Sequence, residues 1–353
     1  KEIDKWELSE IGQSDIAKTS GDYPIYGASG YIGNTNFYHQ EKPYVAVVKD
    51  GAGVGRAALY PANSSVIGTM QYLLPKDNVL PKYLFYVVSY MHLEKYFTGA
   101  TIPHIYFKDY KNEEFNLDLL ERQAEIVEIL EKCEKIIEKR KQEIQLLDQL
   151  IKARFVEMFG NPVLNDKGWE QKSLGEITTK IGSGATPKGG KEAYQEEGIT
   201  LIRSMNVHNG QFEYKDLAHI SDEQASKLDN VTIEEDDVLL NITGASVARS
   251  CVVPNEILPA RVNQHVCIIR CKDCIIPEFL NKLLIDDNYQ DLLWSIAGSG
   301  ATRESITKQQ VENLQIILPM LELQKEFMAF CHQVTKSKLF EFSSLQNHTG
   351  MLQ

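Results

Sequence analysis

The hydrophobic pattern is clearest in the middle of the chain. Residues 117–159 contain neither Gly nor Pro, and Gly160-Asn161-Pro162 follows as a stop signal for a helix. Apolar residues recur there in alternating steps of four and three, which is the spacing of a heptad seam. The seam residues are Ile126, Leu130, Cys133, Ile137, Ile144, Leu147, Ile151 and Met158, with Arg140 and Arg154 in the two interrupting positions. The pattern predicts a helix of about forty residues, roughly 60 Å long, that pairs in a coiled coil.

A second apolar stripe widens the predicted seam. It comprises Val127, Leu146, Leu150 and Phe155, which is more than a thin two-stranded seam requires. Near the C-terminus, residues 321–338 carry a weaker helical pattern that includes Phe327, Cys331 and Val334. After Ser343 the periodicity is lost, so we expect the end of this second helix to fray. We expect the two helices to pair in antiparallel orientation.

The segments that flank the central helix have the pattern of strands. Residues 43–48 precede the Gly-rich turn 51–55, and residues 237–242 precede the turn 243–246. Short β-branched runs that end in Gly-bearing turns are typical of sheets. The flanks therefore predict two α+β domains.

The two flanks are copies of each other. Residues 45–56 align without gaps with residues 238–249, and in the same register Gln71 meets Gln264. Residues 99–101 match 300–302, and Trp6-Glu7 resembles Trp169-Glu170. An ungapped match then pairs Ile105 with Ile306, Phe115 with Ile316, Leu117 with Leu318, Leu120 with Leu321, Gln123 with Gln324 and Ile126 with Phe327. Two such copies suit a molecule with pseudo-twofold symmetry.

These patterns predict an α+β fold with two pseudo-repeated domains, separated by long antiparallel coiled-coil helices. We assign residues 1–117 to the first domain and residues 118–160 to the central spacer helix. Residues 161–318 form the second domain, and residues 319–353 form the C-terminal spacer helix and its frayed tail. The two helices should hold the domains apart.

Composition and charge narrow the possible functions. With 353 residues, 43% hydrophobic and 24% charged, the chain has the composition of a globular protein of about two domains. We expect no membrane span, because no run of eighteen apolar residues occurs, and no secretory signal. Six cysteines are too few for a disulfide framework and favour a cytoplasmic location. The net charge of −12 by itself argues against a nucleic-acid binder, unless the acidic residues are segregated from the binding face.

Motifs that suggest catalysis fail on inspection. The turn 51–56 has Arg56 where a dinucleotide fingerprint needs its third Gly, and no long helix pattern follows it. In residues 184–191, Ala185 takes the place of the first Gly of a phosphate loop, and Glu192 follows Lys191. The Asn-Pro-Pro-Tyr signature of amino-methyltransferases is missing. Tight sheet turns are the favoured interpretation of both Gly-rich segments.

A cysteine cluster leaves one metal-site alternative open. Cys267, Cys271 and Cys274 could bind zinc with a fourth ligand such as His265 or Cys251. However, Cys267 lies in an alternating strand pattern, and the first repeat has no counterpart of the cluster. Buried, inert thiols are the favoured interpretation, and we predict no metal and no catalytic residue in this chain.

Three segments resemble one known family. Residues 300–306 leading into residues 318–324 resemble the end of a type I restriction-modification DNA specificity domain, and residues 26–33 resemble its beginning. Residues 154–162 before Gly168-Trp169 resemble the junction from the central helix into the second recognition domain. The resemblance covers nearly the whole chain. It departs where the first repeat has Ile102-Pro103-His104 in place of Arg303-Glu304-Ser305, and where the second helix is shorter than the first.

The resemblance implies a non-catalytic specificity subunit. Each recognition domain would read one half of a split sequence in double-stranded DNA, and the helices would set the gap. The helices would also dock two modification methyltransferase subunits, which would carry S-adenosylmethionine and methylate adenine. Separate restriction motor-nuclease subunits would use ATP and Mg²⁺ to cut unmethylated DNA. No cofactor is expected in this chain.

Candidate DNA contacts are cations and amides on predicted loops, because such side chains reach base edges and phosphates. Arg56 and Arg249 lie at matching points after the Gly-rich turns, and Lys49 and Arg303 lie beside repeat-matched segments. The remaining candidates are Lys180, Lys188 and Lys191 on a Gly-rich loop and Arg203 and Asn206 after a predicted strand. Gln71 and Gln264 are interpreted as structural. Each cation could instead be a solvated surface charge.

Helix pairing and subunit docking are assigned to the seam. The residues concerned are Ile126, Leu130, Ile137, Ile144, Leu147, Ile151, Phe327 and Val334. The main alternative function is a coiled-coil interaction scaffold whose end domains bind protein. Sequence-selective, salt-sensitive DNA binding would distinguish the specificity subunit from that scaffold. An enzyme with a hidden zinc site is a third alternative, which metal analysis would test.

Overall fold

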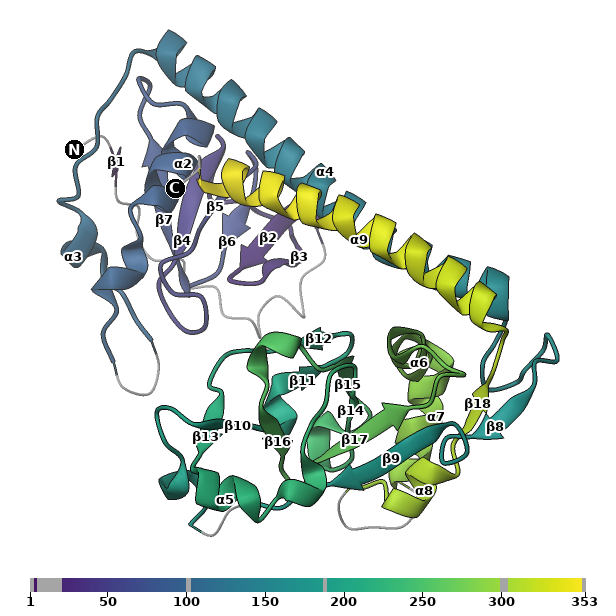
Figure 1. Cartoon of the computed structure of the whole chain (residues 1–353). Helices are drawn as coiled ribbons and strands as arrows, with labels where there is room; N and C mark the ends of the chain where they lie inside the picture. The colour runs from purple at the N-terminus through teal and green to yellow at the C-terminus, as the bar shows by residue number, and fades with distance from the viewer. Residues whose placement is uncertain (1–2, 5–20, 100–102, 187–188, 299–303, 351–353) are drawn as a thin grey trace. The chain divides into compact units, whose positions relative to one another are not determined.

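The computed structural model describes residues 3–4, 21–99, 103–186, 189–298 and 304–350, without the side chains of residues 3–4, 191, 193 and 340–350. By contacts the chain divides into two compact units (Figure 1). Unit 1 comprises residues 1–141 and 343–353, and unit 2 comprises residues 142–342. The division runs through both long helices, so each unit contains a part of each helix. The sequence-based segments, in contrast, treat each helix as a piece of its own.

Unit 1 contains two sheets. The larger sheet has the strand order β1-β7-β4-β5, and the smaller has the order β3-β2-β6. The strands are β1 (Ile3–Asp4), β2 (Tyr23–Gly27), β3 (Gly30–Thr35), β4 (Tyr44–Val48), β5 (Ala57–Tyr60), β6 (Ser65–Val66) and β7 (Met70–Pro75). The helices are α2 (Pro81–Tyr90), the 3-10 helix η1 (Leu93–Tyr96) and α3 (Phe107–Tyr110). All five residues of β4 are buried, as expected for a central strand.

Unit 2 repeats both sheets. Its larger sheet has the order β15-β14-β17-β9, and β13-β10-β16 forms the smaller one. The strands of these sheets are β9 (Thr178–Ser183), β10 (Ile199–Ile202), β13 (Ala218–Ile220), β14 (Val238–Asn241), β15 (Ser250–Val252), β16 (Ala260–Val262) and β17 (Val266–Cys271). In both smaller sheets the middle strand, β2 or β10, pairs antiparallel with one neighbour and parallel with the other. The structure thus confirms the predicted α+β fold with two repeats.

The remaining elements of unit 2 are insertions and connections. One short hairpin is formed by β11 (Val207–His208) with β12 (Gln211–Phe212), and β8 (Gln171–Ser173) pairs with the distant β18 (Gln315–Ile317) in a two-stranded sheet. The α-helices are α5 (Asp222–Ser226), α6 (Pro277–Leu284), α7 (Asp287–Gly298) and α8 (Lys308–Glu312). The 3-10 helices are η2 (Gly190–Ala193), η3 (Ser204–Asn206), η4 (Asp229–Val231), η5 (Gly244–Ser246) and η6 (Asn255–Ile257).

Strand register corrects one match between the repeats. Val47 of β4 pairs with Gln71, whereas Leu240 of β14, its match in the second repeat, pairs with Cys267. The structural counterpart of Gln71 is therefore Cys267, and the predicted pairing of Gln71 with Gln264 is wrong. The second repeat has three more residues between the paired strands, and this insertion places Gln264 in the loop before β17. An ungapped alignment has no means of showing such an insertion.

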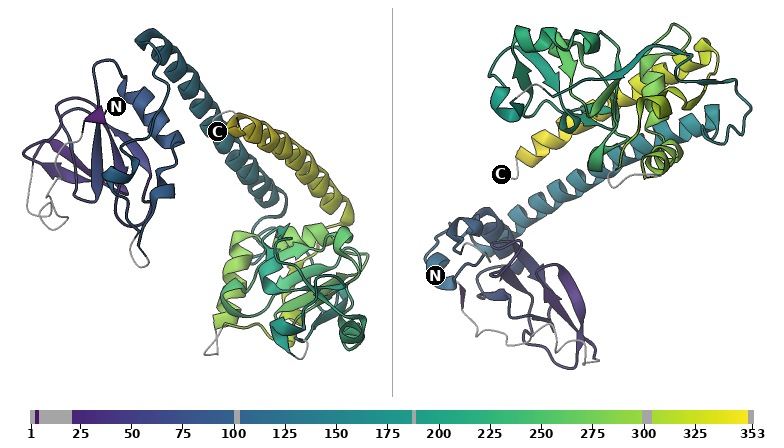
Figure 2. Two further views of the ribbon diagram at one scale, coloured as in Figure 1. Left: turned by 90° about the vertical axis from the view of Figure 1, so that its left-hand side faces the viewer. Right: turned by 90° about the horizontal axis from the view of Figure 1, so that it is seen from below.

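The long helices are α4 (Leu120–Phe159) and α9 (Leu321–Gly350). Within unit 2 they pack antiparallel, since Arg154 pairs with Glu326 at 2.8 Å while Asp148 pairs with Lys338 (Figure 2). The helical prediction for the end of the chain was too short, because the helix continues to Gly350. Among the described residues, no helix is both long and apolar enough to cross a lipid bilayer.

An aromatic cluster anchors this helix pair to the sheet domain of unit 2. Phe155 and Phe159 of α4 pack against Phe279 of α6 and Phe327 of α9, with ring centroids 5.0–6.3 Å apart. All four rings are buried. Their contact surface explains why the apolar face of the central helix is wider than a coiled-coil seam needs: its last turns also belong to the core of a domain.

Candidate functional site

The Gly-rich turn of unit 1 brings three distant segments together. This turn, residues 49–56, connects β4 to β5. The guanidinium of Arg56 donates to the backbone oxygen of Ala28 in the β2–β3 hairpin, and the backbone N–H of Gly51 donates to Pro103 O at 2.9 Å. The turn therefore contacts the segment 26–33, which resembles the specificity family, and also the loop that precedes Ile105.

Glycine is required at one position of this turn by a close backbone approach. Gly55 has φ of +87°, and a Cβ there would lie 2.4 Å from the backbone nitrogen of Glu94. No other residue type fits such a contact without moving the backbone. The turn is thereby fixed against η1, and this holds the neighbouring Arg56 at the surface, where its side chain is exposed.

Two further charged groups lie at the same turn. The carboxylate of Asp50 contacts the ring Nδ1 of His104, and the backbone oxygen of Lys49 accepts a hydrogen bond from Ile105 N. Lys49 is half-buried, and this burial lowers the pKa of its ammonium group. The predicted contacts Lys49 and Arg56 therefore share one turn, with Lys49 the less accessible of the two.

Unit 2 builds the equivalent arrangement. The backbone N–H of Gly244 donates to Glu304 O at 2.9 Å, and Ile306 N donates to Ile242 O at 2.8 Å. Thr243 and Ser305 form an isolated bridge, as Asp50 and His104 do in unit 1. The matched turn and the matched loop are thus adjacent in both repeats. Arg303 itself lies outside the described residues.

Arg249 closes the turn of unit 2 in the position that Arg56 has in unit 1. Its backbone N–H donates to Ser246 O, and its own backbone oxygen accepts from Asn241 N at 2.8 Å. The side chain is half-buried, and within the described part of the chain its guanidinium makes no ion pair or hydrogen bond. No described residue therefore occupies its donors.

Asn206 does not fit the role predicted for it. Its side chain is completely buried, accepts from Arg203 N at 3.1 Å and donates to Glu213 O at 3.0 Å. This is a correction: the amide satisfies buried backbone groups of the insertion between β10 and β13, so it is not presented to DNA. Arg203 is half-buried; its guanidinium lies 5.4 Å from the Tyr194 ring centroid and donates to the backbone oxygen of Asp216. One of its five N–H donors thus bonds within the fold, whereas its buried Nε has no hydrogen-bond partner among the described residues.

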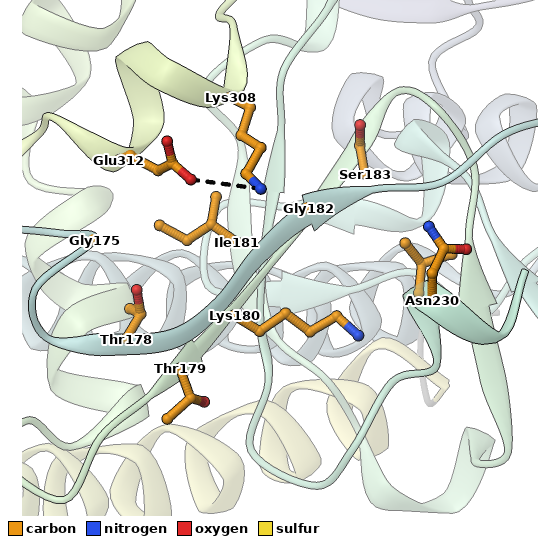
Figure 3. A pocket seen from close by; sticks show the side chains of 11 residues that line it. Gly175, Thr178, Thr179, Lys180, Ile181, Gly182, Ser183, Asn230, Lys308 and Glu312 are labelled. Carbon is orange, nitrogen blue, oxygen red and sulfur yellow. Dashed lines mark ion pairs between the residues drawn. The ribbon is translucent and has the colours of Figure 1, made fainter.

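Lys180 lines a pocket of about 560 Å³ on β9 (Figure 3). The opposite wall carries Lys308, whose ammonium lies 3.5 Å from Glu312. Lys308 is not among the residues predicted from the sequence, although Thr307 and Gln310 form a capping box that marks the start of α8. Two lysines thus border one pocket.

The side chains of the other two lysines of the Gly-rich loop are not described by the structure. Lys188 lies outside the described residues. Only the backbone of Lys191 is described, in η2.

The predicted zinc alternative finds no support in the described residues. They contain no group of three or more His, Cys, Asp or Glu side chains that could hold a metal ion. Burial raises the pKa of Cys251, Cys267 and Cys271 to about 12 each. A thiol binds zinc as its thiolate, so this burial opposes metal binding.

The helix residues divide between two roles. Leu147, Ile151, Phe327 and Val334 pack in the core of unit 2. Ile126 instead packs against the core of unit 1, and with Leu130 it lines a groove of about 1050 Å³ between α2 and α4. Ile137 and Ile144 are half-buried.

An exposed apolar surface remains on the helix pair of unit 2. Leu146 is 60% exposed and Leu150 is 46% exposed on α4, and Leu339 is 62% exposed on α9. Leu146 and Leu150 lie four residues apart and so share one face of α4, and neighbouring exposed leucines are typical of surfaces that another protein covers. The residues of the second apolar stripe thus have different environments: Phe155 lies in the core, whereas Leu146 and Leu150 face solvent.

Comparison with known proteins gives one family. The family described as "Type I restriction modification DNA specificity domain" matches residues 7–147 and 166–342. The type I restriction enzyme MjaIX specificity subunit of Methanocaldococcus jannaschii is 25% identical over 278 residues, which cover 72% of this chain and 62% of that protein. The chain thus spans about three fifths of the length of this relative.

Two solved structures share the fold over nearly the whole chain. The S subunit of a type I restriction-modification system from M. genitalium has a TM-score of 0.59 at 16% identity, covering 99% of this chain and 91% of that one. A chain from a structure of complex assembly and conformational transition in a type I R-M system has a TM-score of 0.63 at 16% identity. It covers 99% of this chain and 93% of that one.

Proposed function

Since this chain belongs to the type I restriction-modification DNA specificity family, we propose that it is the DNA sequence-recognition subunit of such an enzyme. Each repeat reads one half of a bipartite target in double-stranded DNA. The chain itself carries out no chemical step, and it positions partner subunits that do. Because its target is DNA, we place it in the cytoplasm.

One observation carries this proposal: the repeated turn with an arginine at its end. In each unit the turn adjoins the equivalent loop of its own repeat, and the arginine follows the turn at the matching position. Arginine donors bind guanine edges and phosphates, and Gly-bearing turns let the backbone come close to a phosphate. Two copies of one reading device suit a target made of two half-sites. Lys49, Lys180, Lys188, Lys191 and Arg303 are proposed to add phosphate contacts.

The long helices are proposed to dock two modification methyltransferase subunits and, through them, the restriction motor-nuclease subunits. The exposed leucines of the helix pair, Leu146, Leu150 and Leu339, offer an apolar surface for this purpose. S-adenosylmethionine, ATP and Mg²⁺ belong to the partner subunits in this proposal. The helices also set the distance between the two half-sites.

The test is to map methylated adenines in DNA from a host that expresses this chain with its modification subunit. We expect one bipartite motif with a fixed spacer, and no methylation without this chain. Binding of the complex to a duplex with that motif should weaken steeply with salt, since phosphate contacts release counterions. Assembly with a protein partner but without sequence-selective methylation or binding would overturn the proposal and favour a protein scaffold.

A further inference from the structure

Gln264 has an environment that differs from that of Gln71, with which the ungapped alignment matched it. It lies in the loop between β16 and β17, which is where the second repeat has its three additional residues. Its side chain is exposed, although the flanking Asn263 and Val266 are buried. Gln71, by contrast, is buried and donates to the backbone oxygen of Tyr72. Both glutamines were predicted from the sequence to be structural, and only Gln71 has the buried environment that fits this prediction.

A chain of side-chain hydrogen bonds fixes the Gln264 amide. Thr186 donates its hydroxyl to Gln264 Oε1, and Gln264 Nε2 lies 3.0 Å from His265 Nε2. His265 Nδ1 in turn lies 2.5 Å from Thr243 Oγ1. One assignment of protons satisfies all these contacts: the amide donates to His265 Nε2, and His265 Nδ1–H donates to Thr243.

The loops that carry these hydrogen-bonded side chains are held rigidly. Asn263 accepts from His265 N at 3.0 Å with its side chain and from Gly184 N at 3.1 Å with its backbone oxygen. A Cβ on Gly184 would lie 1.8 Å from Val262 O, so the segment that leads to Thr186 lies against the start of the Gln264 loop. An amide on such a support loses little entropy when it binds a ligand.

This series of hydrogen bonds ends at the repeated turn of unit 2. Thr243 opens the Gly244 turn and bridges to Ser305, so Gln264 is linked to the surface on which Arg249 lies. The exposed amide keeps one N–H and one lone pair of Oε1 free of these contacts. A donor and an acceptor side by side match the N7 acceptor and N6 donor that adenine presents in the major groove.

We propose that Gln264 is a specificity-determining residue that reads one adenine in the half-site of the second repeat. This inference rests on the proposed function and adds to it a named base and a named side chain. Thr186 and His265 are positioning residues, because they hold the amide in the orientation that adenine requires. The adenine concerned is one other than the methyl acceptor, which the modification subunit handles.

The experiment uses the complete complex of this chain with its modification subunits and a DNA library randomised in both half-sites. Gln264→Ala should make one adenine position of one half-site degenerate, with a roughly 10- to 100-fold loss of discrimination there. Gln264→Glu should disfavour adenine at that same position, because a carboxylate offers no donor. Thr186→Val should relax the same position to a smaller extent, because the amide loses its orientation.

Gln309→Ala, an exposed glutamine on α8, is the matched control and should leave the motif unchanged. If Gln264→Ala reduces the amount of folded complex, the test rests on the motif that the complex with Thr186→Val methylates. An unchanged motif for the Gln264 and Thr186 variants, or a change at a position that is not adenine, would overturn the inference. A wild-type complex without sequence-selective methylation would instead mean that the proposed function has failed.

Discussion

Gln123 and Gln324 occupy the same position in the two repeats and make the same hydrogen bonds. Gln123 accepts from Leu80 N and donates to Asn78 O and Asp118 O, each at 2.8 Å. Gln324 accepts from Ile276 N at 2.9 Å and donates to Cys274 O at 3.2 Å and Pro319 O at 2.8 Å. Both side chains are completely buried.

Each of these glutamines ties a long helix to a sheet domain. Leu80 and Ile276 are the residues that precede α2 and α6, and neither has a side-chain cap of its own. Gln123 on α4 and Gln324 on α9 satisfy the backbone groups at those helix starts. The amide is suited to this because it offers an acceptor and two donors within one side chain.

Gln324→Leu should therefore destabilise the protein far more than its size change suggests. The substitution leaves one buried N–H and two buried carbonyl groups without a partner, and each such group costs about 1–3 kcal/mol. We expect a loss of at least about 2 kcal/mol in the free energy of unfolding, measured with urea. Gln333→Leu on the exposed face of the same helix is the control and should be nearly neutral. Equal stability of the two variants would contradict the role given to Gln324.

The half-sites should be independent. Arg249→Ala removes a cation from the second repeat alone, so it should weaken or relax one half of the target. Loss of a base contact costs about 1–3 kcal/mol, whereas loss of a phosphate contact weakens all sequences alike. The measurement is methylation of a library with both half-sites varied, and Arg56→Ala should affect the other half. Equal loss of selectivity in both halves would speak against separate reading.

The helix surface should be needed for docking. Leu146 is 60% exposed, so Leu146→Asp should leave this chain folded and reduce its assembly with modification subunits. A charge buried in an interface without a partner costs several kcal/mol. Size-exclusion chromatography with light scattering measures the assembly, and Gln145→Asp, which adds the same charge on another face, is the control. Normal assembly of the Leu146 variant would show that docking uses a different surface.

The helices should determine the spacer between the half-sites. One heptad inserted after Ile137 and one after Val334 lengthen both helices by roughly 10 Å while keeping the seam in register. At about 3.4 Å per base pair, the spacer should grow by at most roughly three base pairs. We expect reduced activity but unchanged base preferences, measured by methylation of a library with variable spacers. If the original spacer length is retained, contacts between domains and partners set the gap.

The buried cysteines should be inert and metal-free. Cys251 and Cys267 are buried, and this burial raises the pKa of both thiols to about 12, so a thiol reagent at pH 8 should leave both unmodified until the protein unfolds. Because the folded pKa exceeds the unfolded value, their contribution to stability is present below about pH 9 and is lost as the pH rises towards 12. Half-exposed Cys133 is the positive control. Stoichiometric zinc in the purified protein would contradict this prediction.

The sequence by itself determined the elements and their repetition. Residues 117–159 lack Gly and Pro and keep a heptad spacing, and local propensity and periodicity suffice to specify such a helix. The Gly-rich turns followed by Arg56 and Arg249 could likewise be matched by position, because each turn depends on residues that are close in the chain. The resemblance to the specificity family rests on the same local segments.

Tertiary structure decided which side chains are accessible. Asn206 follows β10 and Gln264 follows β16, yet the Asn206 side chain is buried and the Gln264 side chain is exposed. Three residues inserted between paired strands shifted the repeat register, and only strand pairing reveals such a shift. Leu146 and Phe155 belong to one apolar stripe in the sequence, but only Phe155 meets Phe279 of α6. Burial depends on neighbours distant in the chain, which periodicity along one helix does not specify.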